Sequence, residues 1–200
     1  MGLFNHTYKE KIALRIYNFL YTKENIILNY ALDNKTKCDL IIVSKVGIFV
    51  INIYDAKGVL SLNSEQDPFW FVMPVKEEKK SFFKSNRSKN NVLNKSKDAK
   101  ANTVPIDNQI DKASLPNPFE ALNKIKDSII SLLKKEDDWF NENTFPVKSI
   151  ALFDNIKNIS DYHIYNLDTF KNYLKSLKKQ SLKNDKINEY SELIKNNGVH

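Results

Sequence analysis

Hydrophobic residues along the chain switch between helical and strand spacing. Apolar positions recur every three or four residues over 8–21, which predicts an amphipathic helix. An apolar run over 26–32 predicts a strand, and β-branched residues over 39–43 and 46–53 predict two more. Because only Ser44-Lys45 separates the last two, we expect them to form an antiparallel hairpin.

The second part of the pattern predicts further strands and helices. Residues 59–62 and 69–73 are consistent with a second, smaller hairpin. Asn117 before Pro118 is typical of a capped helix start, and an apolar stripe follows it. The remaining segments are predicted as strands at 145–153 and 162–165, a helix from Leu167, and a weaker C-terminal helix from Ile187.

Residues 76–113 lack this patterning and are rich in Lys, Asn and Ser. Residues 76–100 hold nine basic and three acidic side chains, so they carry +6 of the chain's net charge of +7. A segment of this length and composition predicts a disordered insertion. We therefore expect one domain built from 1–75 and 114–180, followed by a C-terminal helix or tail at 181–200.

Composition excludes several classes of protein. Cys38 is the single cysteine, so it cannot form an intrachain disulfide, and His6, His163 and His200 are too far apart for metal-ligand spacing. No run reaches the roughly 18–20 apolar residues that span a bilayer. The N-terminus lacks a signal-peptide core, so a cytoplasmic location is expected.

The strongest chemical signal lies between Asp39 and Gly58. Asp39 opens the first strand of the hairpin, and residues 47–51 of the second strand read Gly-Ile-Phe-Val-Ile. Glu10 stands in the first predicted helix, and Asn117-Pro118 opens a later one. These motifs, in the order helix, strand, hairpin, helix, strand, strand, helix, resemble the nuclease-related domain (NERD) family.

The resemblance covers roughly residues 7–75 and 114–175. It implies an α/β fold with a PD-(D/E)XK nuclease-like core, in which a mixed central sheet is flanked by helices. It also implies a site where two carboxylates bind Mg²⁺, which activates water, beside a lysine. Glu10 and Asp39 match retained site positions, and Asp39 would be the metal ligand.

Two positions depart from the family pattern. Asn52 stands where the family has Glu, and Tyr54 stands where it has Lys. Asparagine lacks the negative charge that favours a hard cation, and tyrosine is neutral at neutral pH. Asp55 and Lys57 form a D-x-K three residues downstream, but an odd shift places Asp55 on the opposite strand face unless a bulge intervenes. The site is therefore predicted to be degenerate.

Three functions follow from these observations. The first is a NERD-like domain without catalysis and without a cofactor, which binds nucleic acid or another partner. DNA would then contact the basic residues of the insertion, represented by Lys79, Lys80, Lys84, Arg87 and Lys89. The second is an active Mg²⁺-dependent DNA nuclease that uses Glu10, Asp39 and the shifted Asp55 and Lys57. The third is a module that docks to a protein or membrane surface through the insertion.

Overall fold

A computed structural model describes residues 7–20, 25–61, 68–73, 113–157, 163–177 and 182–199. Its elements, in chain order, are α1 (Tyr8–Leu20), β1 (Ile26–Leu28), β2 (Leu40–Ser44), β3 (Gly47–Ser61), β4 (Phe69–Met73), β5 (Ala113–Pro116), α2 (Pro118–Glu136), β6 (Val147–Lys157), β7 (Ile164–Asn166), α3 (Leu167–Ser176) and α4 (Asn184–Asn197). Within this described part, no helix is long and apolar enough to cross a membrane.

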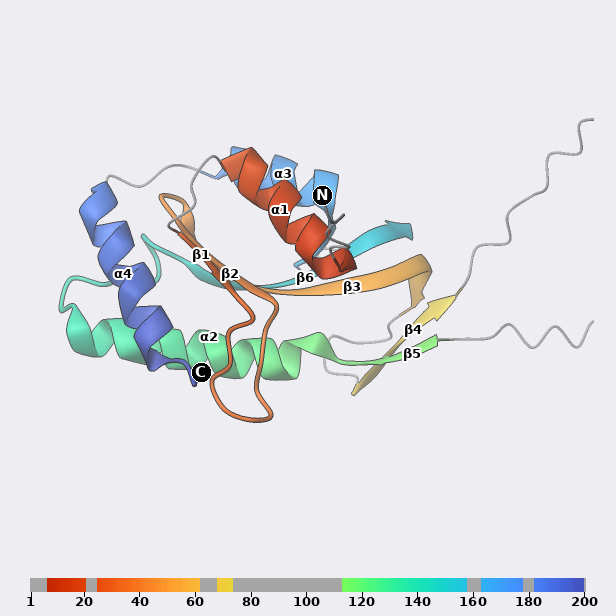
Figure 1. The fold of residues 1–200 in the computed structure, drawn as a ribbon, viewed down its shortest axis with the longest axis horizontal. Helices are drawn as coiled ribbons and strands as arrows, with labels where there is room; N and C mark the ends of the chain where they lie inside the picture. The colour runs from red at the N-terminus through yellow and green to blue at the C-terminus, as the bar shows by residue number, and fades with distance from the viewer. Residues whose placement is uncertain are drawn as a thin grey trace, which may run out of the picture.

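Strand β3 is the centre of a mixed seven-stranded sheet (Figure 1). Residues 47–51 at its start pair antiparallel with β2, and its last three residues pair antiparallel with β4. Along its other edge it runs parallel to β6, which in turn pairs with β7. The sheet is extended by β1 beside β2 and by β5 beside β4. The predicted mixed central sheet is confirmed.

Successive side chains of β3 point to opposite faces of the sheet, and helices cover both faces. Ile48 and Val50 pack in one cluster with residues of α2 and α4, whereas Phe49 and Ile51 pack in another with residues of α1 and α3. These four side chains are fully buried. Figure 1 shows α1 and α3 on one side of the sheet and α2 on the other, with α4 standing at the left-hand end and reaching α2.

Several predicted elements are confirmed. The first helix is α1, and the hairpin is β2–β3 with its turn at Lys45-Val46. The start of α2 is as predicted, because the Asn117 side chain accepts a hydrogen bond from the Phe119 N–H at 2.9 Å and Pro118 follows at the first helical position.

Other boundaries were wrong. The predicted strand 26–32 ends at Leu28, because Asn29 takes a positive φ of 52° that strand geometry does not allow. The predicted separate strand at 59–62 is the continuation of β3, which passes through a register shift between Tyr54 and Lys57. Residues 113–116 form β5, a strand that the polar sequence around them did not predict. The predicted insertion at 76–113 otherwise lies outside the described residues.

Candidate functional site

Both oxygens of the Asp39 carboxylate are engaged at the entrance to β2. Oδ2 accepts the backbone N–H of Ile53 at 2.8 Å, which ties it to β3. Oδ1 accepts a hydrogen bond from the ammonium of Lys9 on α1 at 2.6 Å. The Asp39 side chain is only 17% exposed, whereas that of Lys9 is 56% exposed. The carboxylate is therefore fixed by the sheet on one side and neutralised from α1 on the other.

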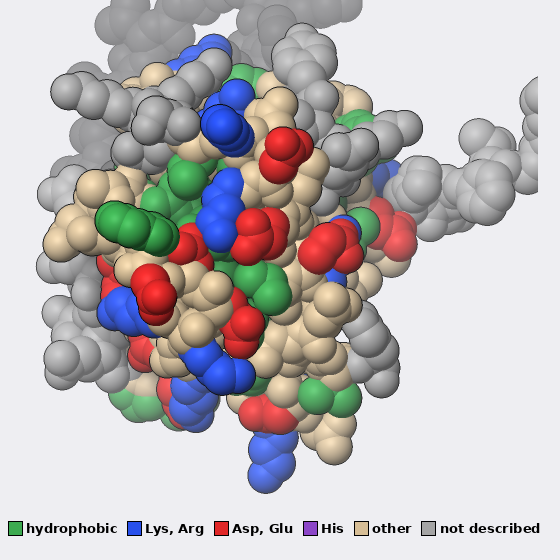
Figure 2. All heavy atoms as spheres, turned by 90° about the vertical axis from the view of Figure 1, so that its left-hand side faces the viewer, with side chains coloured by type: hydrophobic (Ala, Val, Ile, Leu, Met, Phe, Trp, Pro, Cys, Tyr) green, Lys and Arg blue, Asp and Glu red, His purple; other side chains and the backbone are tan. Residues whose placement is uncertain are grey.

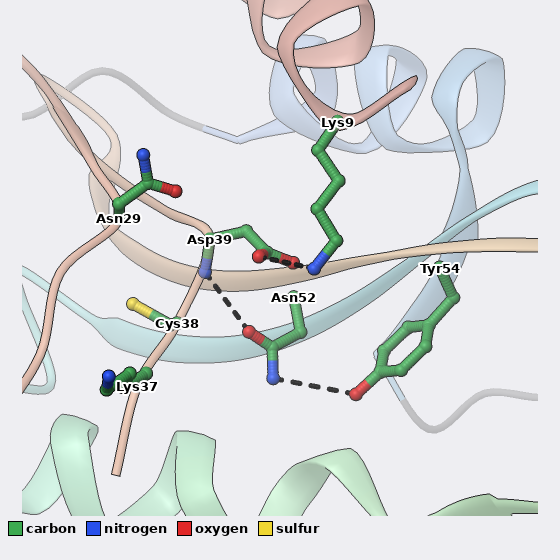
Figure 3. Close-up of a pocket in the computed structure, with 7 residues that line it drawn as sticks. All are labelled: Lys9, Asn29, Lys37, Cys38, Asp39, Asn52 and Tyr54. Carbon is green, nitrogen blue, oxygen red and sulfur yellow. Dashed lines mark hydrogen bonds and ion pairs between the residues drawn. The ribbon is translucent and has the colours of Figure 1, made fainter. Parts of the chain in front are cut away.

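Asn52 and Tyr54 lie next to Asp39 on the neighbouring strand (Figure 3). The Asn52 Oδ1 accepts the backbone N–H of Asp39 at 3.2 Å, and its Nδ2 donates to the Tyr54 hydroxyl at 3.5 Å. Residues 52 and 54 are two apart in a strand that pairs regularly with β6 at these positions, so they share one face. The two residues that the sequence resemblance predicts to depart from the family pattern thus lie beside the carboxylate.

The Tyr54 hydroxyl is a neutral hydrogen-bond donor at neutral pH. Burial raises its pKa to about 12, while the hydrogen bond from Asn52 opposes that shift and the nearby Asp39 charge adds to it. Its ring stacks on Phe153, with centroids 5.0 Å apart. Tyr54 therefore forms a packed, neutral side of the site and does not supply a cation at neutral pH.

These residues line a cavity of about 350 Å³, here termed the Asp39 pocket. Its lining residues are Lys9, Asn29, Lys37, Cys38, Asp39, Asn52 and Tyr54 (Figure 3). The lining holds two ammonium groups and one carboxylate. The Cys38 side chain is 3% exposed, and burial raises its pKa to about 12, so it contributes a neutral thiol. The pocket is therefore net positive and richer in donors than in acceptors.

The donor set of the pocket does not suit a divalent cation. Mg²⁺ prefers carboxylate oxygens, and sites in proteins generally supply one or two of them. The pocket offers a single carboxylate, Asp39, and both of its oxygens are already engaged, Oδ1 with the Lys9 ammonium and Oδ2 with the Ile53 N–H. Over the residues that the structure describes, no group of three or more His, Cys, Asp or Glu side chains could hold a metal ion. The residues of the pocket in this arrangement therefore do not fit a divalent cation.

Glu10 takes part in the capping of α1. Its carboxylate accepts the Thr7 N–H at 2.7 Å, and the Thr7 hydroxyl accepts the Glu10 N–H at 3.3 Å. This reciprocal pair is a capping box. Glu10 does not line the Asp39 pocket, but it lines a neighbouring groove that also touches Asp39. The structure thus places Glu10 near the site and gives it a structural role at the helix start.

Asp55 is placed away from the Asp39 pocket. It is exposed on β3 and lines neither the pocket nor the neighbouring groove. The strand pairs regularly through Tyr54, and its register shift falls after that residue. Ala56, beyond Asp55, packs in the same cluster as Tyr54. The side chain of Lys57 lies outside the described part, so the pairing of Asp55 and Lys57 in catalysis stays a prediction.

Sequence reasoning missed the two lysines of the pocket. Lys9 precedes Glu10 in the first turn of α1, and Lys37 stands two residues before Asp39. Their proximity to predicted site residues was a weak signal, since lysine is common throughout the chain. The predicted basic contacts of the insertion lie outside the described residues: Lys79, Lys80, Lys84, Arg87 and Lys89.

Comparison with known proteins identifies one family. The family model for the nuclease-related domain, abbreviated NERD, matches residues 7–110, just over half of the chain. The matched region includes α1 and β1–β4, and it therefore contains Lys9, Asp39, Asn52 and Tyr54. No curated protein and no solved structure matches the chain significantly.

Proposed function

The chain belongs to the nuclease-related domain (NERD) family, with its PD-(D/E)XK-like fold, and we propose that it is a degenerate member that binds nucleic acid without a metal ion. The observation that carries the proposal is the ion pair between Lys9 and Asp39 at 2.6 Å. The Lys9 ammonium, which belongs to α1, pairs with the Asp39 carboxylate, and the family resemblance predicts this carboxylate to be the metal ligand. The pocket is therefore charge-compensated by the protein itself.

Loss of cleavage follows from the electrostatics of phosphoryl transfer. The reaction needs positive charge close to the oxygens of the phosphate as negative charge builds up on them. Metal ions supply most of that charge in this class of reaction, and they also activate the attacking water. With Asn52 and Tyr54 beside a neutralised Asp39, the pocket has neither a second carboxylate nor a lysine from β3. Single contacts of this kind are worth about 10²–10³ in rate, so their combined loss supports a module that does not cleave.

Binding of an anion remains chemically feasible at the same pocket. The Lys37 ammonium, the Asn52 amide and the Tyr54 hydroxyl are donors that line it. A phosphodiester offers only acceptor oxygens and a negative charge, so it is complementary to this lining. Lysines near a phosphate also release counterions from nucleic acid, which makes such binding weaker at higher salt. These properties favour a nucleic-acid backbone as the ligand class.

The proposal is tested by binding and cleavage assays on the full chain. Fluorescence anisotropy with a labelled DNA duplex should give the same affinity in Mg²⁺ and in a chelator, and the affinity should fall with salt. Lys37→Glu should weaken binding several-fold more than Lys35→Glu, which changes the net charge equally but does not line the pocket. Absence of duplex binding at low salt, or equal effects of the two variants, would contradict binding at the Asp39 pocket.

The cleavage assay uses the same protein with Mg²⁺ or Mn²⁺. Wild type should leave plasmid and linear DNA intact. The informative variant, here termed the revertant, combines Lys9→Gln with Asn52→Glu. The first change removes the ammonium that pairs with Asp39, and the second adds a second carboxylate to the pocket. Isothermal titration should detect Mg²⁺ binding in the revertant and not in wild type. Robust metal-dependent cleavage by wild type that Asp39→Ala abolishes would show an active nuclease instead.

A further inference from the structure

Two phenylalanine side chains of β4 face solvent on the same side of the strand. Phe69 is 54% exposed and Phe71 is 41% exposed, whereas the alternate residues Trp70 and Val72 are buried. A sheet face that meets water usually carries polar residues. Single exposed apolar residues are ordinary on protein surfaces, but two on one face of one strand form a shared aromatic surface. Phe69 and Phe71 are here termed the aromatic pair.

The residues opposite the aromatic pair leave it open to solvent. Strand β5 places Pro116 opposite the first phenylalanine and Ser114 opposite the second. Both are short and exposed, so they do not cover an aromatic ring as a long side chain in the opposite position would. On the other face of β4, Trp70 packs against Phe119 of α2 with ring centroids 5.5 Å apart. This contact fixes the strand that carries the aromatic pair.

The chain on either side of the aromatic pair is basic. Residues 74–112, which join β4 to β5, contain ten basic and five acidic side chains, a net charge of +5. Both ends of this segment start from paired strands, because Val72 lies opposite Ala113. The described residues of the hairpin, 68–73 and 113–117, include no acidic side chain. An anionic partner is therefore attracted to this end of the molecule, on the right in Figure 1.

Trp139 is also exposed, but it lies in a different electrostatic environment. It is 93% exposed in the turn between α2 and β6. Residues 134–142 contain two lysines and four acidic residues, a net charge of −2. Figure 2 faces this end of the molecule and shows acidic and basic side chains interspersed, with isolated hydrophobic ones between them. A net negative turn disfavours a polyanion, so Trp139 is a control for the aromatic pair.

We propose that the aromatic pair stacks on unpaired bases of a single-stranded nucleic acid, an inference that rests on the proposed function in nucleic-acid binding. Proteins bind single strands by combining aromatic rings, which stack on the base faces, with positive charge that follows the phosphates. In a duplex the neighbouring base pairs cover those faces, so only an unpaired segment offers them. The two rings leave the strand about 7 Å apart, about twice the 3.4 Å spacing of stacked bases. Successive bases that each meet a ring are therefore unstacked from each other, which a flexible single strand allows.

An anionic membrane is the competing partner, because it also combines negative charge with an apolar phase. Membrane-surface binding generally uses the whole apolar face of an amphipathic helix, or a covalently attached lipid. The aromatic pair offers two rings on the face of a strand, which is a small apolar area for a membrane. One ring is sufficient to stack on one base. The geometry of β4 therefore favours bases over lipid.

The test is fluorescence anisotropy of a labelled single-stranded DNA of about 15 nucleotides, titrated with the full chain. Phe69→Ala and Phe71→Ala should each weaken binding about fivefold or more, the loss expected for one stacked base. Phe71→Tyr should retain the affinity and Phe71→Leu should lose it, because leucine is apolar but has no ring. Trp139→Ala, the matched control, should bind as wild type does. The factor lost in the phenylalanine variants should not change with salt, since stacking releases no counterions. Circular dichroism checks that each variant is folded.

The same titrations separate this inference from the proposed function. Single-strand binding that both alanine variants leave unchanged overturns the role of the aromatic pair, while the effect of Lys37→Glu on duplex binding still decides the role of the Asp39 pocket. Weaker binding in the alanine variants, with no effect of Lys37→Glu, supports the aromatic pair and rejects the pocket. A wild type that binds neither form of DNA at low salt overturns both. The aromatic pair is also rejected if Phe71→Leu binds as wild type does. The same holds if the alanine variants lose binding to anionic phospholipid vesicles but not to single-stranded DNA.

Discussion

Replacing Lys9 by methionine removes the cation from Asp39 and keeps the length of the side chain. At 2.6 Å, two unit charges attract by about 1.6 kcal/mol in water and about 6 kcal/mol at an effective dielectric constant of about 20. Because Lys9 is 56% exposed, the lower figure applies, and partial ordering of its side chain offsets about 0.5–1 kcal/mol of the attraction. We expect Lys9→Met to lower the free energy of unfolding by about 0.5–1 kcal/mol.

Replacing Asp39 by alanine should cost more, because it also removes the acceptor of the Ile53 N–H. Leaving a buried donor unsatisfied costs about 1–3 kcal/mol, so Asp39→Ala should destabilise the fold by about 2–4 kcal/mol in total. Urea unfolding of both single variants and the double variant gives the coupling energy between the two residues. We expect a coupling of about 0.5–1 kcal/mol that shrinks at high salt.

Lys11→Met is the matched control for this cycle. It lies on the same helix, is exposed, and forms no ion pair with the residues that the structure describes. It should leave the free energy of unfolding nearly unchanged and show no coupling to Asp39. A coupling of zero between Lys9 and Asp39, or a Lys9→Met cost as large as that of Asp39→Ala, would refute the idea that Lys9 is the counterion of this site.

Three further predictions concern stability. Asp137→Ala should lower the free energy of unfolding by about 2–4 kcal/mol in urea titrations, because it removes the acceptor of the Tyr190 hydroxyl and of the Trp139 N–H and leaves Lys186 with Glu189 as its one remaining carboxylate partner among the described residues; a change below about 1 kcal/mol would contradict this. Gly58→Ala should cost about 1–3 kcal/mol by thermal or urea unfolding, because φ is +154° there and a Cβ would lie 2.2 Å from the Met73 carbonyl oxygen; a neutral result would argue against this close approach. Burial raises the pKa of Tyr54 to about 12 from about 10, so its stabilisation is present below pH 10 and is lost as the pH rises towards 12. The unfolding free energy of Tyr54→Phe should therefore fall less steeply over that alkaline range than that of wild type, and parallel curves would disprove the assignment.

Local sequence was sufficient for the elements whose stability comes from nearby residues. The start of α2 depends on Asn117 and Pro118, whose capping chemistry acts within one turn, and the structure has it as predicted. The β2–β3 hairpin was likewise predictable, because a short turn joins two β-branched runs. The fold class was predicted from the family resemblance, which depends on the order of these elements and on the motifs that they carry.

Elements that depend on distant partners were predicted less well. The continuity of β3 through Tyr54 and Lys57 is maintained by its pairing with β6, about a hundred residues later in the chain. Likewise, β5 is only four residues long, follows a polar segment in the sequence, and becomes a strand because it pairs with β4. Hydropathy carries no information on such pairings, since the partner strand supplies the hydrogen bonds.

The sequence by itself determined which side chains the site could contain. The resemblance assigns Asn52 and Tyr54 to the positions of a Glu and a Lys in the family, and strand alternation predicts that both lie on one face with no need of tertiary information. Only the tertiary structure determined the partners of the Asp39 carboxylate. Its carboxylate meets Lys9, thirty positions earlier in the chain, only because α1 packs over the sheet and brings an ammonium group to the entrance of β2. That contact depends on the packing of a helix against the sheet, and so no local pattern of residues could have revealed it.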